Sequence, residues 1–262
     1  MIFVSWPLDS VQLFVLLLIR CLGLVGAAPV FGGVQVPVQA KLSLGLALAA
    51  LLFPLALTHP GDFPVIGNWY QMLGLGVQEA LLGLFIGFMA QLVFFAVQFA
   101  GQLVGMQMGF GIVGVLDPDS GQQVSIISQM QYMLAIVLFL LINGHHLVLQ
   151  ALWQSVEILP IGHAHLDGLL MQEGIRQSAR VLTLGVQLAS PILAALLLSE
   201  VAMGIIARTV PQMNIFIVGF PVKIAVGLGM LILLLPALVQ ILSQEVARGG
   251  ELLAGLLRHM AS

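Results

Sequence analysis

Long stretches without a charged residue constrain this chain more than any other feature. No charged residue lies between Glu79 and Asp117, and none lies between Asp119 and Glu157. Each stretch is long enough to cross a bilayer, for which about 20 apolar residues suffice. Only 7% of the 262 residues are charged, whereas soluble domains carry about 25%. We therefore expect an integral membrane protein, or a deeply buried subunit of one.

The apolar segments predict an all-α protein, with about six helical segments arranged as hairpins in a single domain over residues 1–262. Backbone polar groups in lipid need internal partners, which favours helices over open sheets. The third and fourth segments are about twice as long as the hydrocarbon layer is thick, at roughly 1.5 Å per residue. A proline at position 191 is able to kink the fifth. The segments run over residues 11–28, 42–57, 69–108, 124–158, 169–209 and from 224 past 244.

The third and fourth segments each carry a polar stripe, whose residues fall within about 40° of one line on a helix. Unsatisfied amides in lipid cost several kcal/mol, so both faces are expected to meet other polar groups. Packing of the two segments against each other, and contact with other subunits or a conduit, both fit the pattern. The stripes consist of Gln91, Gln98, Gln102, Gly105 and Gly109, and of Ser125, Gln129, Tyr132, Asn143, Gln150 and Gln154. Small-xxx-small spacings, which let backbones approach closely, come from Gly83, Gly87, Gly101, Gly105 and Gly109.

A glycine-rich polar break separates the third and fourth segments. It runs over residues 109–121 and carries Asp117 and Asp119. Glycine permits φ > 0 conformations that let a loop rearrange. Met106 and Met108 lead into the break, and methionine suits a surface that must seal around varied partners, although ordinary apolar packing explains them as well. The pattern predicts a movable constriction in a protein that spans a membrane or lines a conduit.

Two charges lie deep in apolar sequence. Glu200 and Arg208 are two turns apart on one helix face, and intramembrane charges are usually paired or functional. Side chains eight positions apart do not meet easily, so each is expected to pair with another helix or subunit. A structural ion pair that fixes assembly is favoured here over a proton relay.

Signals for enzymatic or metal chemistry are thin. The run His163-x-His165-x-Asp167 has ligand-type side chains, but its spacing is generic. The sequence has no Walker loop, and no catalytic triad is indicated. The formal charge of −3 gives no nucleic-acid footprint. We expect no enzyme activity, no cofactor, no metal and no nucleic-acid partner.

Several motifs together resemble the FliR family of flagellar export-gate proteins. The resemblance begins with Arg20, Ala28-Pro29-Val30-Phe31, Val36-Pro37 and Lys41. It continues with Gly101-Gln102-x-x-Gly105-x-Gln107-x-Gly109-Phe110, Asp117-Pro118 and Ser120-Gly121. The strongest part is Ser199-Glu200-x-x-x-Gly204-x-x-x-Arg208-x-x-Pro211-Gln212-x-Asn214-x-Phe216, followed by Gly219-Phe220-Pro221-x-Lys223. The motifs span nearly the whole chain in the expected order.

This resemblance implies a core subunit of the type III protein export gate in the bacterial inner membrane, at the flagellar basal body. In that family one FliR-like chain joins several copies of FliP and FliQ in a closed-mouthed channel for exported flagellar proteins, with FlhB wrapped around it. The fold is that of a fused FliP–FliQ pair, with bent hairpins lifted largely out of the bilayer plane. The partners implied are therefore FliP, FliQ, FlhB, the exported proteins and membrane lipids.

The resemblance also implies roles for particular residues. The loop over residues 106–121 matches the plug of the closed pore. The implied gating residues are Met106, Met108, Gly109, Phe110, Gly111, Ile112, Val113, Val115, Leu116, Asp117 and Pro118. The implied subunit-assembly residues are Gln98, Gln102, Gly105, Glu200, Arg208, Pro211, Gln212, Asn214, Phe216 and Lys223.

Two alternatives remain open at the level of sequence. Broken helices with proline, glycine and buried charge also mark secondary transporters and ion-channel subunits. Such a protein would function without these partners and would contain an inverted repeat, and no clear repeat is visible. A homologue of the injectisome subunit SctT is the other alternative, although the Asp117-Pro118-x-Ser120-Gly121 form looks flagellar.

Overall fold

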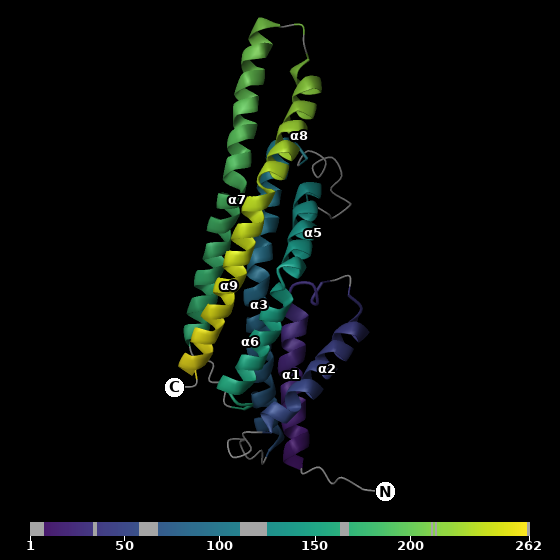
Figure 1. Ribbon diagram of the computed structural model, residues 1–262, viewed down its shortest axis with the longest axis vertical. Helices are drawn as coiled ribbons and strands as arrows, with labels where there is room; N and C mark the ends of the chain where they lie inside the picture. The colour runs from purple at the N-terminus through teal and green to yellow at the C-terminus, as the bar shows by residue number, and fades with distance from the viewer. Residues whose placement is uncertain are drawn as a thin grey trace. The chain divides into compact units, whose positions relative to one another are not determined.

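The computed structural model describes residues 8–33, 36–57, 68–110, 125–162, 168–210, 212 and 214–260. Within these residues all regular structure is helical (Figure 1). Four of the helices are long and apolar enough to cross a membrane, or up to six spans exist if each of two bent helix pairs counts as one. The predicted all-α integral membrane protein is confirmed. The helices are α1 Leu8–Ala27, α2 Val38–Ala56, α3 Trp69–Met108, α5 Ile126–Leu141, α6 Gly144–Ile158, α7 Gly168–Thr209, α8 Ile215–Leu233 and α9 Leu235–Met260.

The two longest helices follow the sequence pattern closely. The third predicted segment coincides with α3, a helix of 40 residues. Helix α7 continues for 42 residues through Pro191. Because proline lacks an N–H group, the Gln187 carbonyl loses its usual donor four residues later. The Ser190 hydroxyl donates to that carbonyl at 3.0 Å, which helps the helix to tolerate the proline.

The structure corrects two predicted segments. The fourth is not continuous, because α5 ends at Leu141 and α6 starts at Gly144. Between them Asn143 adopts the left-handed conformation at φ 58°, which asparagine tolerates better than most residues. The last segment begins at Ile215 rather than at 224, and it is interrupted between α8 and α9. Pro236 lies in the first turn of α9, where the missing N–H costs nothing.

The chain divides into two compact units. The first comprises residues 1–92, 143–177 and 245–262, and the second comprises residues 93–142 and 178–244. Helices α3, α7 and α9 each contribute to both units. The single functional domain expected from the sequence stays a prediction.

In the first unit, α1 packs closely on α3 through glycines. A side chain at Gly83 would collide with the Arg20 carbonyl oxygen. A Cβ at Gly87 would lie 2.7 Å from the Leu24 carbonyl oxygen, and one at Gly23 would lie 2.8 Å from that of Ala80. The small-residue spacing predicted for close backbone approach is therefore confirmed here.

A strained turn follows α1 in the same unit. Val30 has φ 71°, which is an outlier for a β-branched residue. The Gly32 N–H donates to the Ala28 carbonyl at 2.8 Å, and the Lys41 ammonium donates to the Gly32 carbonyl at 2.9 Å. A Cβ at Gly32 would collide with the Gly26 carbonyl. The turn is thus held by its hydrogen bonds and by the absence of a side chain at position 32.

The core of the second unit joins α3, α5 and α7. Phe94 of α3 packs edge-on against Phe139 of α5, with ring centroids 5.2 Å apart. Side chains from α8 and from the break between α8 and α9 pack against this core. Its buried members are Ala100, Val104, Met108, Ile127, Ala189, Ile192 and Leu196.

Candidate functional site

The end of α3 forms the first edge of the predicted central loop. Gly109 has φ 95°, and its N–H donates to the Met106 carbonyl at 3.1 Å. The Phe110 N–H donates to the Gly105 carbonyl at 3.0 Å. This pair of bonds around a left-handed glycine is a Schellman motif, which ends a helix with its last carbonyls satisfied. A side chain at Gly109 would also collide with the Phe220 ring.

The apolar side chains at this edge have different environments. Met106 is 57% exposed, whereas Met108 is 1% exposed and belongs to the core of the second unit. Phe110 is partly buried against the same core. The packing interpretation of Met108 is confirmed. Phe110 fixes the end of α3 in this structure, and the plug role assigned to these residues stays a prediction.

The remaining gating residues lie outside the described part of the chain. They are Gly111, Ile112, Val113, Val115, Leu116, Asp117 and Pro118. The same holds for the histidine and aspartate run at 163–167. Among the described residues no group of three metal-ligating side chains occurs.

A polar cluster centred on Glu200 ties three helices together beside the end of α3. The Lys223 ammonium of α8 donates to Glu200 Oε1 at 2.8 Å, and Gln107 Nε2 of α3 donates to Glu200 Oε2 at 3.1 Å. Glu200 is half exposed and Lys223 is 21% exposed. The expectation that Glu200 pairs with another helix is confirmed. Gln107 was not among the predicted site residues, although it is part of the motif that carried the resemblance.

Other predicted assembly residues pack within the chain. Gln102 Oε1 accepts a hydrogen bond from the Ser125 backbone N–H at 3.2 Å. The Ser128 hydroxyl donates to the Gln98 carbonyl at 2.9 Å. A Cβ at Gly105 would collide with the Ser125 hydroxyl. The polar stripe therefore serves packing of α3 on α5 at these positions, one of the two interpretations left open by the sequence.

The turn between α7 and α8 holds the rest of the predicted assembly residues. Arg208, Gln212 and Asn214 are exposed. The Asn214 carbonyl accepts from the Ile217 N–H at 3.1 Å, at the start of α8. Pro211 and the side chain of Phe216 lie outside the described part of the chain. Their assignment to subunit contacts stays a prediction.

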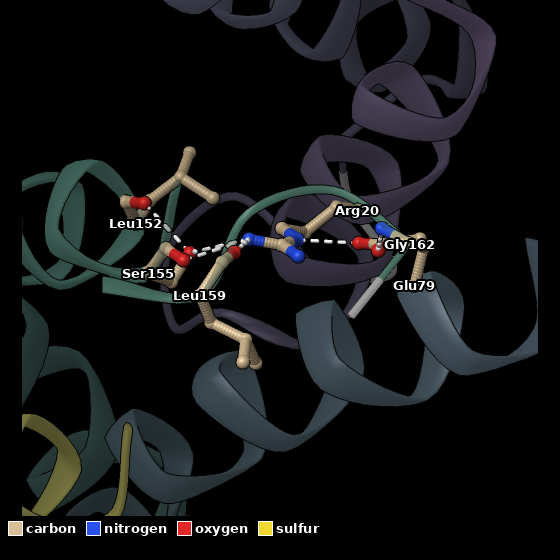
Figure 2. A network of polar contacts seen from close by, with 6 residues as sticks. All are labelled: Arg20, Glu79, Leu152, Ser155, Leu159 and Gly162. Atoms are coloured by element: carbon tan, nitrogen blue, oxygen red, sulfur yellow. Dashed lines mark hydrogen bonds and ion pairs between the residues drawn. The ribbon is translucent and has the colours of Figure 1, made fainter. Parts of the chain in front are cut away.

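A buried ion pair in the first unit was not predicted from the sequence. Figure 2 shows Arg20 of α1 reaching Glu79 of α3, with Nε donating to Oε2 at 2.5 Å. Both side chains are 0% exposed. In the sequence, Arg20 belongs to the first motif shared with the FliR family, and Glu79 ends an uncharged stretch. Charge in an apolar segment was the available signal, but a partner 59 residues away cannot be identified from a single sequence.

The same two side chains also satisfy backbone groups at the end of α6 (Figure 2). Arg20 Nη1 donates to the carbonyls of Ser155 at 2.9 Å and Leu159 at 3.1 Å. Glu79 Oε1 accepts from the Gly162 N–H at 2.9 Å. The last carbonyls of a helix have no intrahelical donors, and a cation there interacts favourably with the helix dipole. The network thus fastens α1, α3 and the end of α6 into one unit.

Comparison with known proteins places these features in a family. Residues 11–249 match the family described as bacterial export proteins, family 1. A flagellar biosynthetic protein FliR of Pectobacterium carotovorum is 34% identical over 265 residues, which cover 99% of this chain and 98% of the relative. The FliR protein of Bacillus subtilis is 34% identical over 228 residues, 86% of each chain. That of Escherichia coli is 31% identical over 244 residues, 93% of this chain and 92% of the relative.

Proposed function

We propose that this chain is a channel-forming core subunit of the flagellar export gate. It belongs to family 1 of the bacterial export proteins and, within that family, to the flagellar FliR proteins. A role in flagellar protein export follows from the family itself. The finer proposal is that the chain assembles with FliP, FliQ and FlhB in the bacterial inner membrane, at the basal body. There its central loop helps to close the pore against ions until an exported flagellar protein displaces it.

The observation that supports this proposal is that the C-terminal end of α3, from which the central loop starts, is held in place by packing and hydrogen bonds. A loop that opens and closes a pore repeatedly needs an attachment that does not move with it. At the end of α3 the Schellman motif satisfies the backbone, and Phe110 packs on the core. The bonds from Gln107 and Lys223 to Glu200 tie this end to α7 and α8. These contacts support a gate in which only the loop beyond Phe110 moves.

Deletion of residues 111–116 tests the gating proposal. Phe110 is kept because it belongs to the anchor, so the shortened chain retains its packing. We expect cells or proteoliposomes that contain the assembled gate to leak ions, because the apolar side chains that exclude water are gone. The matched control is an equally long replacement by leucine-rich sequence, which restores an apolar plug. An assembled gate with the deletion and normal ion retention would contradict the gating role.

Substitution of Arg208 tests the assembly proposal. Arg208 is exposed at the end of α7, and loss of an arginine anchor at an interface typically costs more than about 1 kcal/mol. We expect Arg208→Ala to reduce recovery of the complex with FliP and FliQ about tenfold, the equivalent of about 1.4 kcal/mol. Arg176→Ala serves as control, because Arg176 lies on the same helix and pairs locally with Glu173. Native mass spectrometry of the co-expressed subunits reports the recovery, and equal recovery of both variants would refute the assignment.

A further inference from the structure

The first half of α3 exposes a continuous apolar stripe. Tyr70, Leu73, Val77, Leu81 and Leu84 are each at least 43% exposed. At 100° per residue they fall within an arc of about 80° on one helix face. Between Leu73 and Leu84 the side chains of the stripe carry no hydrogen-bonding group. Protein–protein interfaces usually contain about one hydrogen bond per 100–200 Å², which this face cannot supply from its own side chains.

An aromatic pair ends the stripe. Trp69 and Tyr70 at the start of α3 stack with ring centroids 3.7 Å apart, and they are 63% and 69% exposed. Tryptophan and tyrosine are enriched where a membrane meets water, because their rings are apolar and their N–H or O–H groups reach polar partners. The pair is therefore of the type that marks the headgroup level.

The length and charge of the stripe fit the hydrocarbon layer. From Tyr70 to the half-buried Phe88 the helix rises about 27 Å, close to the hydrocarbon thickness of about 30 Å. The one charged residue in this interval is Glu79, which points inward and pairs with Arg20 at 0% exposure. The buried ion pair thus leaves the outer face of this part of α3 without charge.

Another helix of the same unit presents a different face. On α6 the exposed residues include His146, Gln150 and Glu157, and Trp153 is 45% exposed beside them. The exposed face of α6 is thus mixed, with polar side chains beside Trp153 and Leu147. Helix α2 of the same unit also exposes apolar side chains, among them Val38, Leu42 and Leu51, so the α3 stripe is distinguished by its aromatic end and its length rather than by apolar exposure alone.

We propose that the stripe of Tyr70, Leu73, Val77, Leu81 and Leu84 contacts lipid acyl chains directly, with Trp69 and Tyr70 at the headgroup level of one leaflet. The partner is the bilayer itself, and the stripe fixes how deep this end of α3 lies. The inference needs only that the chain is a membrane protein, so it does not depend on the gate proposal. It identifies a part of α3 that lies in lipid.

Depth-dependent fluorescence quenching tests this proposal, since the chain has three tryptophans at positions 6, 69 and 153. One variant, W6F/W153F, keeps Trp69 alone, and a control, W6F/W69F, keeps Trp153 alone. A third carries Leu81→Trp in a background where all three are Phe, about 16 Å farther along the helix than Tyr70 and so near the bilayer centre. Each full-length chain is reconstituted alone and as the co-purified complex, in phosphatidylcholine brominated either near the headgroup or near the chain end.

We expect Trp69 to lose several-fold more emission with the shallow bromines than with the deep ones, and the tryptophan at position 81 to show the opposite order. Trp153 should be quenched several-fold less than Trp69 by either lipid. Failure of both lipids to quench Trp69, or equal depth preference at positions 69 and 81, would overturn the proposal. Quenching in the chain alone that vanishes in the complex would also overturn it, because a protein partner would then cover the stripe.

Discussion

Glu79→Gln removes the negative charge that pairs with Arg20 while keeping nearly the same shape. Both partners are 0% exposed, so the variant leaves a guanidinium buried without a counter-ion. Removing one partner of such a pair typically costs about 3–5 kcal/mol. Arg20 keeps its bonds to the Ser155 and Leu159 carbonyls, which places the expectation at the lower end, about 3 kcal/mol or roughly a hundredfold in the folding equilibrium.

A double-mutant cycle separates the interaction free energy of the Arg20–Glu79 pair from the contributions of their other contacts. Arg20→Met alone leaves Glu79 buried with the Gly162 N–H as its remaining partner. The double variant removes both charges and is expected to cost less than the two single variants summed. Contacting residues in one network usually couple by about 0.5–3 kcal/mol, and a fully buried pair should lie in the upper half of that range.

Unfolding in a denaturing detergent, followed by tryptophan fluorescence, measures these differences. Glu173→Gln is the matched control, because Glu173 pairs with Arg176 three residues later and Arg176 is 78% exposed. Such local pairs contribute about 0.2–0.5 kcal/mol. If Glu79→Gln cost no more than Glu173→Gln, the network of Figure 2 would not hold the first unit together, and the reasoning would be refuted.

Two further substitutions have defined expectations. Val30→Gly should leave the fold intact and raise the thermal midpoint in detergent. The strain at φ 71° costs about 1–3 kcal/mol, and glycine offsets only about 0.5–1 kcal/mol of that through chain entropy. A lower midpoint would show that the valine side chain stabilises the turn more than the strain destabilises it. Gly105→Val should destabilise the second unit by about 1–3 kcal/mol, because its side chain would collide with Ser125. Gly204→Val should cost less than about 1 kcal/mol, because nothing lies within 4 Å of the added Cβ. Equal loss of stability in both variants would argue against close packing of α3 on α5.

The sequence predicted the helices where apolar composition and length decide the outcome. The third segment, predicted at about residues 69–108 between two breaks, coincides with α3. The end of α3 was predictable because Gly109 is the residue type that a left-handed helix end requires. The resemblance of motifs to the FliR family was confirmed by relatives that cover nearly the whole chain.

Other features depend on contacts that periodicity does not encode. The break between α5 and α6 falls at Asn143-Gly144, a dipeptide typical of turns, and Asn143 has the left-handed conformation that asparagine tolerates; this local signal was overridden by the apolar run around it. Glu79 was missed because a single carboxylate in an apolar helix does not reveal which distant residue neutralises it. Gln107 was missed for the same reason, since its partner Glu200 lies 93 residues farther along the chain. For Glu79 and Gln107 the missing information is the identity of a distant neighbour.

The position of Arg20 also bears on how the protein is made. Its counter-ion lies 59 residues later, and the carbonyls that it binds lie 135 and 139 residues later. When α1 first leaves the ribosome, none of these groups has been synthesised, and an arginine at the centre of a lone membrane helix costs about 2.5–3.5 kcal/mol at the translocon. The Arg20 side chain of α1 therefore stays in water or in the insertion machinery until α6 has been synthesised. The first unit is therefore completed only late in synthesis, after the residues that satisfy Arg20 have been made.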